Sequence, residues 1–166
     1  MNFQFYLEKL HSSEVFKKFM KESPGAYICS GFFTVDKEGT DNQRHLDFYI
    51  PEKKQMFSFK LEKETEKIPV ELTIERVPEK LSTNFDFEFE EMEKLILDEM
   101  EKQNIKNKLQ KIIISLQNVK GKNLLVCTVF ISMLGLLKVH IGLESNKPKI
   151  VLFEKKSFFD MVKKVK

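Results

Sequence analysis

The chain has 166 residues, of which 42% are hydrophobic and 32% are charged, with 16 Phe, 3 Tyr and no Trp. This apolar content can build a core and excludes a wholly disordered chain, while 6 Gly and 5 Pro exclude collagen-like or low-complexity architecture. The two cysteines, Cys29 and Cys127, are too few for a disulfide framework or a structural zinc site.

The net charge of +3 is unevenly distributed along the chain. Residues 62–101 carry a net charge of −9, whereas residues 102–166 carry +11. Such asymmetry has two interpretations that the sequence leaves open. The basic segment either forms a binding face, or it is neutralised by the acidic segment in the fold.

The first half of the chain predicts a helix followed by four strands. Apolar side chains recur at helical spacing over Phe3–Glu22, and Ser12 or Ser13 can cap a second helical piece within this segment. Strands are predicted over 26–35, 45–50, 56–61 and 68–77. The first of these is apolar on both faces, which is typical of a central strand, and Pro69 favours an edge position for the last.

The second half predicts the same order of elements. Asn84 or Asp86 can cap a helix that continues to about Asn104, and a short helix over Ser157–Val165 closes the chain. Four strands are predicted between these helices, over 111–119, 124–132, 136–143 and 149–155. We therefore expect an α+β fold in a single domain, internally duplicated as a helix plus four antiparallel strands, with pseudo-repeats 1–80 and 81–166.

This order of elements resembles two groups of known folds. Counted from the first strand, it resembles the Whirly-type and PUR-repeat proteins, which bind single-stranded nucleic acid. Counted from the first helix, it resembles a tandem of cystatin-like or PepSY-like units, which often bind peptides or inhibit proteins. The resemblance concerns the fold and assigns no functional residue.

Candidate site residues lie on two of the predicted strands. His45, Asp47 and Tyr49 alternate along one strand and share a face, where an imidazole beside a carboxylate could act as a general base. Lys138 and His140 share a face of the corresponding strand in the second half. A solvated strand face is the simpler interpretation of the same alternation. The chain lacks nucleotide-binding, metal-binding and nucleophile-elbow motifs, so we expect no catalytic residue, metal or cofactor.

Basic residues of the last third suggest a different partner. Lysines occur in predicted turns and at the ends of strands, where phosphate groups could reach them: Lys106, Lys108, Lys120, Lys122, Lys147 and Lys149. Single-strand binders also need aromatic platforms for the bases, and Phe130, Phe153, Phe158 and Phe159 are all predicted to lie in the core.

The sequence therefore favours a non-enzymatic binding or scaffolding domain that recognises a protein or peptide through a sheet face or edge. A nonspecific single-stranded nucleic-acid binder is the alternative, and a small-ligand pocket or enzyme around His45, Asp47 and Tyr49 is a weaker one. The apolar stretch 124–137 is shorter than the roughly 20 residues that span a bilayer, so we expect a cytoplasmic protein without membrane contact. Homodimerisation remains open.

Overall fold

The computed structural model describes residues 1–72, 77–144 and 147–157. Three helices and an eight-stranded antiparallel sheet are present in these residues, which confirms the α+β class. In chain order, the elements are α1 (Phe3–Ser12), α2 (Glu14–Glu22), β1 (Tyr27–Asp36), β2 (Arg44–Ile50), β3 (Gln55–Lys60), β4 (Glu66–Val70), α3 (Phe89–Lys102), β5 (Leu109–Val119), β6 (Lys122–Ile131), β7 (Gly135–Gly142) and β8 (Lys149–Ser157).

Serine and asparagine caps determine where the first two helices begin. The Ser13 hydroxyl accepts a hydrogen bond from the backbone N–H of Phe16 at 3.1 Å, so Ser13 caps α2 as the sequence predicts. In α1 the same role belongs to Asn2, whose side-chain oxygen accepts from the N–H of Phe5 at 3.0 Å. One helical segment of the sequence is therefore divided into two short helices.

The sheet has the strand order β4-β3-β2-β1-β5-β6-β7-β8. Antiparallel pairing of β1 with β5, from Ser30 opposite Gln117 to Asp36 opposite Lys111, joins two four-stranded meanders. The sequence predicted both the central place of β1 and the edge position of β4, which contains Pro69. The halves differ in that two helices precede β1 and one precedes β5, and internal duplication remains a prediction.

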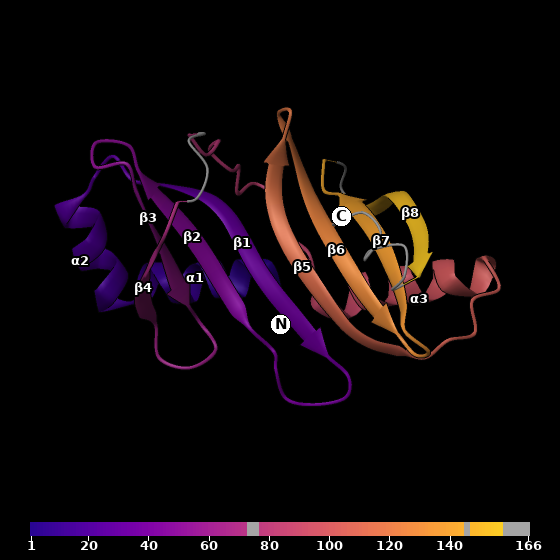
Figure 1. Cartoon of the computed structure of the whole chain (residues 1–166). Coiled ribbons are helices and arrows are strands. Elements are labelled where there is room, and N and C mark those ends of the chain that lie inside the picture. Colours follow the sequence, from indigo (N-terminus) through magenta and orange to yellow (C-terminus); the bar gives the residue numbers. More distant parts are fainter. Residues whose placement is uncertain (73–76, 145–146, 158–166) are drawn as a thin grey trace.

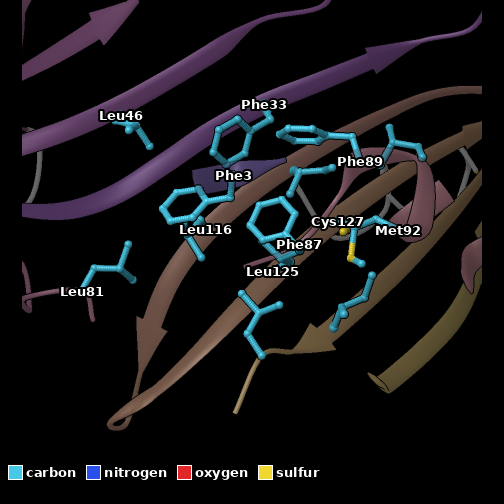
Figure 2. Close-up of a cluster of buried hydrophobic side chains, with 14 of the residues drawn as sticks. Phe3, Phe33, Leu46, Leu81, Phe87, Phe89, Met92, Leu116, Leu125 and Cys127 are labelled. Atoms are coloured by element: carbon cyan, nitrogen blue, oxygen red, sulfur yellow. The ribbon is translucent and has the colours of Figure 1, made fainter. Parts of the chain in front are cut away.

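All three described helices lie on the same side of the sheet, and the other face, which carries no described helix, is called the uncovered face (Figure 1). The core fills the space between helices and sheet, where Phe3, Phe33, Phe89 and Met92 meet (Figure 2). The ring of Phe3 stacks on that of Phe87 with centroids 5.5 Å apart. Burial of these large side chains supplies the main driving force for attaching the helices to the sheet.

The third helix begins later than the sequence predicts. Neither Asn84 nor Asp86 caps α3, whose N-cap is Glu88 without a side-chain bond to the helix. The cause is a contact distant in sequence, because the backbone N–H of Phe3 donates to the carbonyl of Phe87 at 2.9 Å and keeps that segment non-helical. The capping prediction was therefore wrong.

Two further predictions extend beyond the described residues. The strand predicted over 68–77 ends at Val70, and residues 73–76 lie outside the described residues. Ser157 is the last residue of β8, and the rest of the predicted C-terminal helix, 158–165, lies outside the described residues. Among the helices that are described, none is long and apolar enough to cross a membrane.

Candidate functional site on the uncovered sheet face

The register of the sheet determines which side chains lie on the uncovered face. Alternate residues point to opposite faces of a strand, and Phe33, Leu46, Leu125 and Val139 belong to the core beneath the helices. Their chain neighbours therefore lie on the uncovered face. One row across this face consists of Lys60, His45, Phe32, Ser115, Val126, His140 and Leu152.

His45, Asp47 and Tyr49 share this face, as their alternation predicts, but each has a separate partner. His45 Nε2 lies 2.8 Å from Glu62 Oε1. Asp47 Oδ2 accepts a hydrogen bond from the Ser30 hydroxyl at 2.7 Å. The imidazole of His45 is therefore not hydrogen-bonded to Asp47 or to Ser30 in the described residues. A histidine that acts as a general base would need such a contact.

Tyr49 is only 3% exposed, which leaves little of its side chain for a ligand. Its ring packs edge-on against Tyr27, with centroids 5.7 Å apart. We assign Tyr49 to packing on the uncovered face.

Asp47 has a carboxyl pKa that its surroundings shift. Burial raises the pKa of its carboxyl, while hydrogen bonds from Ser30 and Ser58 and the charge of His45 oppose that shift. The nearby Cys29 thiol is also buried, and burial raises its pKa to about 12. A thiol with this pKa stays protonated and is a poor nucleophile at neutral pH.

Lys138 and His140 also lie on the uncovered face, in β7. Burial lowers the pKa of His140, the charge of Lys138 lowers it further, and Glu154 opposes the shift. His140 Nε2 is buried and has no hydrogen-bond partner in the described chain. His45 lies in the same row but four strand spacings away, roughly 19 Å at about 4.8 Å per strand. The two groups of predicted site residues therefore do not form one pocket.

The face of β5 to β8 is more apolar than the sequence suggested. Its half-buried aliphatic side chains are Ile113, Leu124, Val126, Leu136 and Leu152. Phe130 lies beside Leu136 on this face and is 36% exposed, so its predicted place in the core was wrong. The cause is register, because Val129 and Ile131 take the two adjacent inward positions. Phe153 packs against the core as predicted, and Phe158 and Phe159 lie outside the described residues.

The turn lysines lie at both ends of the sheet. Lys106 and Lys108 precede β5, whereas Lys120 and Lys122 occupy the turn after it, with Lys147 and Lys149 where β8 begins. The eleven residues of β5 span roughly 36 Å at about 3.3 Å per residue. Lys108 also pairs with Glu38 at 3.3 Å, which neutralises part of one end. These lysines do not form one continuous basic patch.

The uncovered face also carries a cavity that no sequence motif predicts. It occupies about 900 Å³ between the central strands and residues 71–72 and 77–79. Cys29, Ser30, Met56, Ser115 and Gln117 lie on its sheet side. Ser30 connects the cavity to Asp47 through the hydrogen bond described above. Sequence patterns could not locate this cavity, because its walls come from strands and a linker that are far apart in the chain.

Metal binding has no support in the part of the chain that is described. No group of three or more His, Cys, Asp or Glu side chains is arranged there to hold an ion. In the acidic loop after β1, the Asp36 carboxylate accepts from the backbone N–H groups of Glu38, Gly39 and Asp41, as in an ordinary hairpin loop.

Comparison with known proteins identified no relative, since no family model, curated protein or solved structure matches the chain.

Proposed function

We propose that this protein is a binding or scaffolding domain that recognises a protein segment on the uncovered face of β5 to β8. The single observation that supports the proposal is the apolar composition of that face. The exposed ring of Phe130 lies beside half-buried Leu136, and half-buried Val126 and Leu152 lie on the same face in the row of His140, where a wholly solvated sheet face would carry mostly polar side chains.

Charge on the same face indicates the chemistry of the partner. Lys138 is exposed near the apolar side chains, while Lys111 is partly neutralised by Asp41, whose Oδ2 lies 2.6 Å from its ammonium group. A segment that alternates apolar and acidic side chains would match Phe130 and Lys138 together.

The proposal can be tested by selecting peptides from a displayed random library and measuring their affinity by fluorescence anisotropy. Phe130→Ala should weaken binding by roughly tenfold if this ring is a central contact. Phe5→Ala is the matched control, because Phe5 in α1 is 39% exposed but lies on the helix side of the sheet.

A second pair of variants tests the charge. Lys138→Glu should weaken acidic peptides, whereas Lys94→Glu in α3 should leave their affinity unchanged. Equal losses in Phe130→Ala and Phe5→Ala, or selection of peptides that bind the helix side, would overturn the proposal.

A second candidate function rests on the exposure of Phe130. Its strand neighbour is Lys111, so an aromatic platform and a cation lie together on the uncovered face, as in proteins that stack single-stranded bases. Labelled oligothymidylate should then bind at low salt, weaken steeply at moderate salt and bind less well to Phe130→Ala. Absence of binding at low salt would reject this candidate.

Dimerisation and a cytoplasmic location also remain predictions. Sedimentation equilibrium and microscopy of the tagged protein would test them.

A further inference from the structure

The cavity on the uncovered face is bounded by a segment of chain that is firmly attached to the sheet. Tyr27 Oη donates to the carbonyl oxygen of Pro78 at 2.5 Å. The backbone N–H of Leu81 donates to Ile28 O at 2.9 Å, and Asn118 Nδ2 donates to Lys80 O at 3.1 Å. These bonds attach residues 78–81 to β1 and to the end of β5, and Pro78 and Glu79 of this stretch line the cavity.

The interior of the cavity is largely apolar. Cys29 and Met56 contribute sulfur atoms 3.5 Å apart on the sheet side, while Leu72, Val77 and Val119 line the rest. The three charged residues of the lining, Glu71, Glu79 and Lys120, are all exposed. A charged ligand would lose its hydration among these apolar side chains without gaining a buried counter-ion.

A small number of neutral polar atoms also face this space. Ser30 donates its hydroxyl hydrogen to Asp47, and Gln117 Nε2 donates to the Ser115 hydroxyl oxygen at 2.8 Å. Within the described residues, the Ser115 hydroxyl hydrogen and Gln117 Oε1 therefore remain without a partner. They supply one donor and one acceptor for a bound molecule.

We propose that this cavity binds a small uncharged ligand with an apolar body and one polar group, which contacts Ser115 and Gln117. A volume of about 900 Å³ lies within the range of small-molecule sites, roughly 300–1,000 Å³. The site is distinct from the protein-binding face around Phe130 and does not depend on that proposal. It also differs from a pocket around His45, because His45 does not line the cavity.

The neutral fluorophore N-phenyl-1-naphthylamine is a suitable probe, because its rings are apolar and its single N–H can donate to Gln117. Binding is followed by its fluorescence and by ¹³C-methyl resonances of the methionines. The Met56 methyl should shift saturably with the probe, whereas Met133, which lies outside the cavity and is 90% exposed, should not shift. The comparison of Met56 with Met133 uses the wild-type protein, so it tests the site even if a variant fails to fold.

Two variants test the location of the probe. Ser115→Trp fills the cavity and should lower the affinity at least tenfold, whereas Thr128→Trp changes another half-buried hydroxyl residue on the same face outside the cavity and should not. Gln117→Leu removes the acceptor at similar size and should weaken binding by roughly two- to tenfold, the typical net value of one hydrogen bond.

Three results would overturn the inference. The first is a Met56 resonance that does not shift, or that shifts together with Met133. The second is equal or tighter binding of the anionic analogue 8-anilino-1-naphthalenesulfonate, because the cavity would then not prefer uncharged molecules. The third is displacement of the probe by a selected peptide, which would assign the cavity to a peptide side chain. Loss of peptide binding with retention of probe binding would reject only the proposed protein-binding function.

Discussion

Asp86 Oδ1 accepts a hydrogen bond from the backbone N–H of Gln4 at 3.1 Å, although the two residues are 82 positions apart in the chain. The other carboxylate oxygen accepts from Asn2 Nδ2 at 2.7 Å. Backbone N–H groups in the first turn of a helix have no intrahelical partner, and a negative charge there is favourable for the helix dipole. Asp86 thus attaches the linker before α3 to the beginning of α1.

Replacement of this carboxylate should destabilise the fold. We expect Asp86→Ala to lower the free energy of unfolding by about 1 kcal/mol, the typical effect of losing a helix-capping side chain. Urea unfolding followed by circular dichroism measures the difference. Asn84→Ala is the control, because Asn84 accepts only a local bond from Ser82 and should change stability little. Equal losses in the two variants would contradict the capping role.

The sequence predicted elements more reliably than it predicted their ends and exposed faces. The strands are apolar and regularly interrupted by turn residues, so seven of the eight strands in the described residues lie close to their expected positions, while β4 ends at Val70 instead of residue 77. The start of α3 could not be predicted, since it depends on the distant contact between Phe3 and Phe87. Local capping preferences cannot anticipate such a contact.

The face of a side chain could be predicted where a strand alternates apolar and polar residues, and could not be predicted where it does not. Alternation placed His45 and Asp47 on one face correctly, because β2 has a clear period of two. In β6 seven of the ten residues are apolar and fall on both faces, so the inward and outward positions cannot be distinguished from the sequence, which predicts Phe130 in the core. Register with β5 resolves this ambiguity, and register depends on the whole sheet.

A close approach in β1 leads to a second prediction. A Cβ atom at Gly31 would lie 2.9 Å from Cζ of Phe33, whose side chain is fully buried, and 3.3 Å from Cβ of Leu116. Gly31→Ala should therefore force packing to shift and cost about 1–3 kcal/mol of unfolding free energy. Gly142→Ala is the matched control in β7, where the nearest atom would be at an ordinary 3.4 Å. Similar unfolding midpoints for both variants would contradict this reason.

The turn between β6 and β7 supports a third prediction, of increased stability. Met133 and Leu134 have φ values of 63° and 57°, a left-handed conformation that costs non-glycine residues roughly 1 kcal/mol each. They are 90% and 70% exposed, so replacing them loses little burial. The double variant Met133→Asn/Leu134→Gly should raise the free energy of unfolding by about 1–2 kcal/mol in urea titrations.

The turn between β5 and β6 provides a control in which a glycine with positive φ is removed instead of introduced. Gly121 has a φ of 83°, and a Cβ there would meet no atom within 4 Å. Gly121→Ala should thus lose about 1 kcal/mol through backbone conformation alone. A neutral or destabilising result for the Met133→Asn/Leu134→Gly variant would mean that the exposed tip makes stabilising contacts that offset its backbone conformation.

The last prediction concerns the pH dependence of stability and compares two carboxyls whose pKa values are shifted in opposite directions. Burial raises the pKa of Asp47 above its ordinary value of 3.8. The hydrogen bond from Lys111 is the main cause that lowers the pKa of Asp41 below the same value. A raised carboxyl pKa means that the folded state binds the proton more tightly, so ionisation at neutral pH costs stability. A lowered carboxyl pKa has the opposite sign and stabilises the fold above pH 3.8.

Asp47→Asn should therefore be more stable than wild type at about pH 7, because the amide oxygen can still accept from Ser30 while the cost of a buried charge disappears. Its advantage should shrink as the pH falls through the raised pKa of Asp47 towards 3.8, where the wild-type carboxyl becomes protonated in both states. Asp41→Asn should be less stable at neutral pH, and its deficit should disappear as the pH falls through the lowered pKa of Asp41. Urea unfolding across this range measures both differences, and equal signs at neutral pH would contradict the assigned causes.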